Sequence, residues 1–231
     1  MKASASKEIV QLRQLLAERF PHLRTSLDVA PKARAVSPTG LPQLDSLLHG
    51  GLPKGAIAEL VGENKSGTGS ALLLHAILRH AHEQNQLVAL IDGGDSFDVA
   101  AVEQEILSRL LWVRCHNTDE ALKATDILLR DRNLPLVVLD LKSNPAKQLR
   151  KISGTVWYRL QRIVQQTTTA FVVITPFAMV SGADARIVLN HSPFGISALS
   201  QEQPELLSQL TFELTRGAFE QPIETQVAEA G

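Results

Sequence analysis

The chain has 231 residues, of which 44% are hydrophobic and 20% charged, and its formal net charge is −1. This length allows one α/β domain with a proper core, with or without a small appendage, and the composition is that of a globular protein. A net charge this close to zero excludes a generally basic chain, so any affinity for nucleic acid must come from a local patch.

The sequence also indicates the compartment. Cys115 is the single cysteine, which excludes an intramolecular disulfide and favours a reducing environment. No apolar run follows the first residues, so we expect no signal peptide. No stretch reaches the roughly 18 apolar residues of a membrane span. These features predict a soluble, cytoplasmic protein.

The N-terminal segment predicts a short amphipathic helix. Its apolar residues fall on one stripe and are Ile9, Leu12, Leu16 and Phe20. Prolines at positions 21, 31, 38 and 42 then mark a loop region. We therefore expect an N-terminal helix and linker over residues 1–36. The apolar stripe is a candidate partner-binding surface, or it packs on its own domain as most amphipathic helices do.

A short helix is predicted before residue 56, and from there onward apolar strands alternate with helical patterns. The predicted helices are 44–48, 70–84, 99–110, 120–130 and 155–166. The predicted strands are 56–62, 87–92, 110–115, 134–140 and 170–176, followed by 186–190 and 210–216. Continuous apolar strands between helices predict an α/β fold with a mostly parallel sheet, flanked by helices, and antiparallel strands at its edge.

The segment "GENKSGTGS", residues 62–70, is close to a phosphate-binding P-loop. Its glycines have the spacing of G-x-x-x-x-G-K-[ST], and it stands between a strand and a helix. Thr68 replaces the lysine that would neutralise phosphate charge, and Gly69 replaces the hydroxyl residue that would hold Mg²⁺. The candidate nucleotide-binding residues are Gly62, Lys65, Gly67, Thr68, Gly69 and Ser70. The alternative is a glycine turn that binds no ligand.

Lys65 lies inside this loop and has two interpretations. It could reach a phosphate or a partner subunit. Alternatively, it is a solvated loop lysine.

Several segments, in order, resemble the RecA-like ATPase superfamily. They are "SPTGLPQLDSLLHGGLPKGAIAELVG" (37–62), "LIDGGDSFD" (90–98), "RCHNTDEALKATDILLR" (114–130), "LVVLD" (136–140) and "LTFELTRGAFEQPI" (210–223). The resemblance implies a RecA-like core domain over residues 37–223. It also implies that Asp140 holds the position of the magnesium-associated aspartate. The acidic composition of the C-terminal end predicts a disordered tail at 224–231.

The departures from the RecA pattern all indicate the loss of ATPase residues. Beyond Thr68, the family's catalytic glutamate is Gly94, the adenine-stacking aromatic is Ala101, and the γ-phosphate-sensing strand end reads Thr175-Pro176. The resemblance therefore implies little or no ATP hydrolysis, with ATP and Mg²⁺ as at most weak ligands. The rival hypothesis is an active DNA-dependent ATPase in which Lys65 and Asp95 replace the lost groups and Asp140 keeps its role.

A basic segment follows the strand that ends at Asp140. Residues 141–162 contain six lysines and arginines and no Asp or Glu. The candidate DNA-binding residues are Lys147, Arg150, Lys151, Arg159 and Arg162. Cations that follow phosphates, with Trp157 and Tyr158 to stack on bases, suit single-stranded DNA. Alternatively, Trp157 packs in the core and the basic side chains are only solvated.

A short RecA-like chain with a degenerate P-loop and an amphipathic N-terminal helix resembles the ImuA-type proteins, close to the SulA-like group. The resemblance implies an accessory role in DNA repair and damage-induced (SOS) translesion synthesis. The implied partners are mutasome proteins, namely a Y-family polymerase homologue and an error-prone replicative-type polymerase. A second hypothesis is a regulator of RecA or of cell division that contacts no DNA. A homo-oligomer is possible, and neither a membrane partner nor a metal site is expected.

Overall fold

The computed structural model describes residues 35–62, 69–190 and 200–217. The expected N-terminal helix, with Ile9, Leu12, Leu16 and Phe20, therefore lies outside the described residues. So do Lys65, Gly67 and Thr68 of the P-loop-like segment, and the expected acidic tail.

The core of the fold is a seven-stranded sheet in the order β5-β4-β6-β7-β3-β8-β9. All neighbouring strands are parallel except β9, which runs antiparallel to β8 at the edge. Their bounds are β3 (Ala56–Gly62), β4 (Val88–Asp92), β5 (Leu110–Arg114), β6 (Leu136–Asp140), β7 (Ala170–Thr175), β8 (Ala185–Asn190) and β9 (Thr211–Gly217). The predicted α/β fold with a mostly parallel sheet is confirmed.

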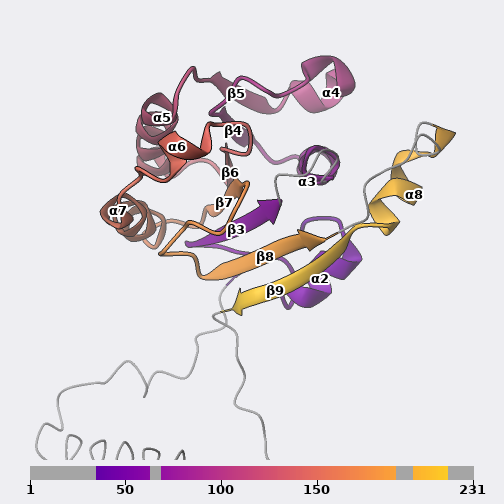
Figure 1. Ribbon diagram of the computed structural model, residues 1–231. Coiled ribbons are helices and arrows are strands. Elements are labelled where there is room, and N and C mark those ends of the chain that lie inside the picture. The colour runs from indigo at the N-terminus through magenta and orange to yellow at the C-terminus, as the bar shows by residue number, and fades with distance from the viewer. Residues whose placement is uncertain (1–34, 63–68, 191–199, 218–231) are drawn as a thin grey trace, which may run out of the picture. The chain divides into compact units, whose positions relative to one another are not determined.

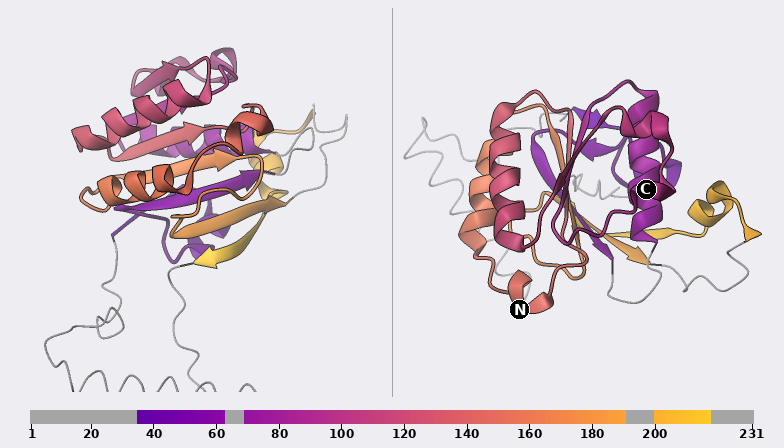
Figure 2. Two further views of the ribbon diagram at one scale, coloured as in Figure 1. Left: turned by 60° about the vertical axis from the view of Figure 1, so that its left-hand side comes forward. Right: turned by 90° about the horizontal axis from the view of Figure 1, so that it is seen from above.

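Helices cover both faces of this sheet (Figures 1 and 2). One face carries α3 (Ser70–Glu83) with the shorter α2 (Pro42–Leu47) and α4 (Gln104–Leu107). The other carries α5 (Thr118–Asp131), α6 (Ala146–Leu149) and α7 (Gly154–Val164). Because both faces are covered, every residue of β3, β4, β6 and β7 is buried, which is why these strands are mostly apolar.

Local signals fix where the long helices begin. At the start of α5, the Asn117 side chain accepts a hydrogen bond from the Glu120 backbone N–H at 2.9 Å. The Glu120 carboxylate in turn accepts from the His116 N–H at 2.9 Å, a reciprocal arrangement close to a capping box. Ser153 caps α7 by accepting from the Thr155 N–H at 3.3 Å.

Two hydrophobic cores lie on the two faces of the sheet. On the α3 side, Leu73, Ile77 and other apolar residues of α3 pack against the strands. On the α5–α7 side, Trp157 and Leu160 pack with Phe171 of β7. Trp157 is only 1% exposed, so the prediction that it is available for base stacking is wrong and the alternative, a core residue, is confirmed.

Some predicted elements differ from the structure. The helix expected over 99–110 is a 3-10 turn, η1 (Val99–Ala101), followed by α4, because Val102 between them is extended (φ −115°, ψ 136°). The strand expected at 186–190 is antiparallel to β9, as expected for the edge of the sheet, but it is also parallel to β3, which was not expected. Three short features were not predicted: the pair β1 (Val36–Ser37) and β2 (Leu52–Pro53), helix α6, and α8 (Gln203–Ser208).

Within the described ranges, no helix is both long and apolar enough to cross a membrane.

Candidate functional site

The site begins where β4 and β6 end, side by side. The parallel register pairs Asp92 with Asp140, so both carboxylates lie at the same edge of the sheet. Asp92 is fully buried and accepts hydrogen bonds from the backbone N–H groups of Ser96 (2.9 Å) and Phe97 (2.8 Å). Its two oxygens therefore hold the turn that follows β4.

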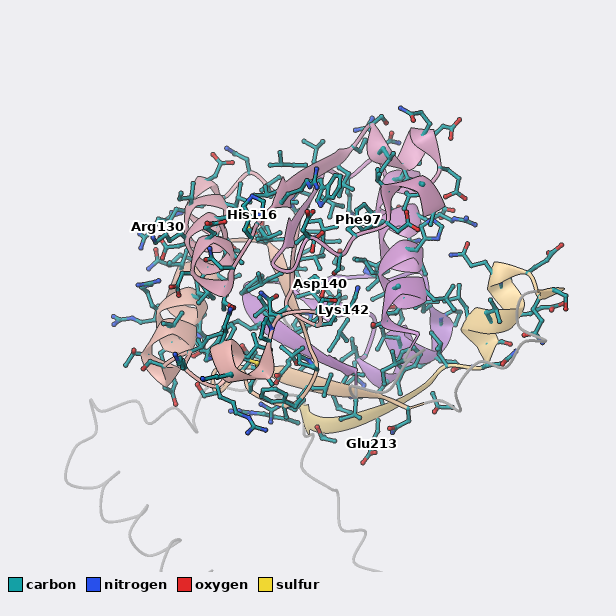
Figure 3. All side chains as sticks on the ribbon, turned by 45° about the horizontal axis from the view of Figure 1, so that its top comes forward. Phe97, His116, Arg130, Asp140, Lys142 and Glu213 are labelled. Carbon is teal, nitrogen blue, oxygen red and sulfur yellow. The ribbon has the colours of Figure 1, made fainter. Side chains whose placement is uncertain are left out.

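Asp140 is bound on both of its oxygens by a single residue, Lys142 (Figure 3). The backbone N–H of Lys142 donates to Oδ1 at 3.0 Å, and the ammonium donates to Oδ2 at 2.7 Å. The Asp140 side chain is 2% exposed and that of Lys142 is 20% exposed. Burial raises the pKa of Asp140, and the adjacent Lys142 ammonium and its hydrogen bonds oppose that rise.

The loop that carries Lys142 is anchored on both sides. The Leu141 N–H donates to the carbonyl of Ile174 on β7 at 2.9 Å. The Asn144 side-chain amide donates to the carbonyl of Gly93 at 2.7 Å, after β4. The Lys142 backbone is therefore held next to Asp140. Sequence reasoning counted Lys142 in the basic segment but missed this pairing, although its position two residues after a strand-end aspartate is a usable signal.

These residues do not fit the magnesium ion that the RecA pattern implies. A Mg²⁺ site needs near-octahedral oxygen ligands, and a cation at Asp140 would have to displace the Lys142 ammonium. The neighbouring carboxylate, Asp92, is already engaged by backbone N–H groups. Over the described ranges, no group of three or more His, Cys, Asp or Glu side chains is arranged to hold a metal ion.

Asp95, the candidate replacement for the catalytic glutamate, forms a two-pronged ion pair with Arg114. The guanidinium Nε and Nη2 donate to its two oxygens at 2.7 and 2.8 Å. Arg114 also lies over the Trp112 ring, 5.0 Å from its centroid. The hydrogen bonds from Arg114 hold the pKa of Asp95 below its usual value. A carboxylate with both oxygens bound and a lowered pKa is poorly suited to take a proton from water.

The frame of the P-loop-like segment is described at its two ends. Gly62 is the last residue of β3, and Gly69, with φ of 70°, precedes Ser70, the first residue of α3. The order of strand, glycine loop and helix thus agrees with the sequence, and the nucleotide-binding roles of these residues stay predictions.

A basic groove lies between α5 and α7, with a volume of about 490 Å³. Four arginines from two segments of the chain line it. Its residues are Arg130, Arg132, Thr155, Tyr158, Arg159, Arg162, Ile163 and Gln166. We refer to these eight residues as the arginine groove.

Asp126 links the two sides of the arginine groove. One carboxylate oxygen lies 2.7 Å from Nε of Arg130 on the same helix, and the other lies 3.1 Å from Nε of Arg159 on α7. Arg132 donates to the Gln166 side chain at 3.0 Å. Arg162 has no hydrogen-bond or ion-pair partner among the described residues. One carboxylate among four guanidiniums leaves the groove strongly cationic.

The five predicted DNA-binding residues separate into two groups. Arg159 and Arg162 line the arginine groove. Lys147, Arg150 and Lys151 are exposed on and just after α6, where the Arg150 guanidinium lies 5.6 Å from the centre of the Phe177 ring. Tyr158 is 55% exposed, whereas Trp157 points into the core. Sequence reasoning missed Arg130 and Arg132 because they precede the basic segment and meet α7 only through packing.

A third buried carboxylate, Glu59, lies in the middle of β3, and sequence reasoning also missed it. It is 0% exposed and accepts hydrogen bonds from the Thr175 hydroxyl and from the N–H groups of Met179 and Val180. Arg186 of β8 donates to its other oxygen at 2.5 Å. This network joins three neighbouring strands and the loop after β7. A charged residue within an otherwise apolar strand is the signal that sequence reasoning could have used.

The described residues form an α/β domain in which β3 ends at Gly62 and α3 begins at Ser70, on either side of the glycine-containing segment. The family model described as the RecA N-terminal domain matches residues 27–156, which is more than half of the chain. The chain belongs to this family.

Individual RecA proteins are similar over a shorter stretch. The chain is 36% identical to Protein RecA of Clavibacter michiganensis over 109 residues, which is 46% of this chain and 30% of that protein. It is 33% identical to Protein RecA of Picosynechococcus over 116 residues, which is 49% of this chain and 32% of that protein. The matched part thus spans only about a third of the length of these relatives.

Proposed function

We propose that this protein is a RecA-fold accessory protein in DNA repair and damage-induced mutagenic translesion synthesis, which contacts single-stranded DNA and does not hydrolyse ATP efficiently. Membership of the RecA N-terminal domain family supports the link to DNA repair. The resemblance to ImuA-type proteins supports the accessory role, with mutasome proteins or RecA as partners. The tail, the N-terminal helix and its apolar stripe belong to this proposal as candidate partner-binding parts.

The observation that carries the DNA contact is the arginine groove. Guanidinium groups match phosphate oxygens with two parallel hydrogen bonds, and the groups from α5 and α7 converge on one groove. The exposed Tyr158 ring in the same groove offers a face for base stacking. Thr155 and Ile163, the first and last α7 residues that line the groove, are eight residues apart, or about 12 Å along the helix. That is about three to four nucleotides at the spacing of a stacked strand.

Two features support weak or absent hydrolysis. Thr68 brings no charge to the position of the P-loop lysine, and Asp140 is paired with Lys142 rather than exposed to a ligand. Transition-state electrostatics are usually the largest contribution to catalysis, so both losses bear on rate. Titration with ATP and Mg²⁺ tests this part. Turnover that Asp140→Ala abolishes would instead establish the rival, an active ATPase.

Charge reversal in the arginine groove tests the DNA contact. We expect Arg159→Glu with Arg162→Glu to weaken binding to single-stranded oligonucleotides and to lower the salt dependence. The slope of log K against log salt should fall by about 0.7 for each phosphate that the protein no longer neutralises. Fluorescence anisotropy at several salt concentrations measures both. The matched control is Lys54→Glu with Arg109→Glu, which makes the same charge change outside the groove and should leave the slope unchanged.

A parallel variant, Arg150→Glu with Lys151→Glu, shows whether DNA binds at the arginine groove or at the basic residues of α6. Loss of binding in this variant alone would move the DNA contact to α6. Absence of salt-sensitive binding in the unmodified protein would favour a regulator that contacts no DNA. Purified Y-family homologue and replicative-type polymerase, tested by co-elution with the full chain, address the proposed partners directly.

A further inference from the structure

We propose that the ammonium of Lys142 is a built-in cation that takes the place of a divalent metal ion at Asp140, so that this strand end binds no Mg²⁺. The inference deepens the proposed lack of efficient hydrolysis, because it concerns the same strand end. It does not depend on the DNA contact.

The first argument is that a cation already contacts the carboxylate. Both oxygens of Asp140 are bound by Lys142, one by the backbone N–H at 3.0 Å and one by the ammonium at 2.7 Å. Asp140 is 2% exposed, so water supplies little compensation. A buried carboxylate requires a nearby cation or hydrogen-bond donors, and this one has both from a single residue.

The second argument is preorganisation. The loop carrying Lys142 is tied to β7 by Leu141, which is 0% exposed, and to the end of β4 by Asn144. The Gly93 N–H also donates to the Asp140 carbonyl at 2.9 Å. Since the backbone on both sides is anchored, the Lys142 backbone N–H cannot leave Oδ1 without breaking these bonds. The donor is thus part of the fold and does not depend on a ligand.

The third argument is the state of the neighbouring acid. A divalent ion between the ends of β4 and β6 would draw on Asp92 as well as Asp140. The oxygens of Asp92 accept from the Ser96 and Phe97 N–H groups at 2.9 and 2.8 Å, and the residue is fully buried. A metal ion that took the lone pairs now used by these donors would break hydrogen bonds at both carboxylates. Replacing one ammonium by one metal ion offers no compensating acceptor for those N–H groups.

Thermal denaturation of the full chain tests the inference with Lys142→Met, Asp140→Asn and the double variant, each in Mg²⁺ and in EDTA. The unmodified protein should have the same Tm in both media. Lys142→Met leaves a buried charge without its cation and should lower Tm by about 6–20 °C. In the Asp140→Asn background the same substitution should cost much less, because no charge remains to be compensated.

Lys147→Met is the matched control, since this lysine is exposed on α6, five residues further along. It should leave Tm unchanged. The inference is overturned if Mg²⁺ or Mn²⁺ raises the Tm of the unmodified protein and Asp140→Asn removes that rise. It is also overturned if Lys142→Met costs the same with and without the Asp140 charge.

These outcomes are separable from those of the proposed function. If Asp140 binds metal but single-stranded DNA still binds in the arginine groove, the built-in cation is refuted and the DNA contact stands. If Tm shows the expected coupling but DNA does not bind, the built-in cation stands without the DNA contact.

Discussion

Replacing Arg186 by methionine should destabilise the fold by about 3–5 kcal/mol, because it leaves the Glu59 carboxylate buried without its cation. Glu59 is 0% exposed, and Arg186 is its charged partner at 2.5 Å. Arg186 also donates to the Val180 carbonyl at 2.9 Å, so the substitution removes a second bond in the same network. Urea denaturation measures the loss as a lower midpoint at unchanged slope.

Arg216→Met is the control for this variant. Arg216 pairs with Arg186 in the register of β8 and β9, is exposed, and donates a single hydrogen bond to the Ser181 carbonyl at 3.0 Å. Its removal should cost less than about 1 kcal/mol. Glu59→Gln should reduce the further cost of Arg186→Met, since the amide carries no charge. Equal losses for the two arginine variants would contradict a structural role for the buried pair.

The elements that could be predicted are those whose signal is local. The buried strands β3, β4, β6 and β7 are mostly apolar, and their predicted bounds lie within two residues of the observed ones. The long helices α3, α5 and α7 have a clear apolar period. The short pieces α6 and α8 have four and six residues, too few for a period to be recognised. The parallel pairing of β8 with β3 depends on the tertiary structure, which no local sequence pattern reveals.

In the candidate site, too, some features could be predicted from the sequence and others could not. The position of Asp140 at a strand end could be predicted, but its pairing with Lys142 depends on how the following loop is anchored. Glu59 and Arg186 are 127 residues apart in the chain, so their contact arises only from the pairing of β3 with β8. The arginine groove likewise requires α5 to pack beside α7. Contacts between distant segments need the tertiary structure, which single-sequence reasoning does not supply.

The neighbours Trp157 and Tyr158 should have opposite roles, which two alanine variants can separate. Trp157 is 1% exposed and belongs to the core formed by α5, α7 and the sheet. Trp157→Ala should therefore destabilise the protein by about 3–5 kcal/mol. Tyr158 is 55% exposed, so Tyr158→Ala should change stability by no more than about 0.5 kcal/mol.

For DNA binding, we expect the substitution at Tyr158 to have a larger effect than the substitution at Trp157. If Tyr158 stacks on a base in the arginine groove, Tyr158→Ala should weaken single-stranded DNA binding by about 1–3 kcal/mol, or roughly 5- to 150-fold. Trp157→Phe, which keeps an aromatic ring in the core, should bind with unchanged affinity because the indole is buried away from the groove. Urea denaturation of the two alanine variants and anisotropy titrations of Tyr158→Ala and Trp157→Phe provide the four values. A larger loss of affinity in Trp157→Phe than in Tyr158→Ala would mean that DNA binding opens the α7 core, which its close packing with Leu160 and Phe171 argues against.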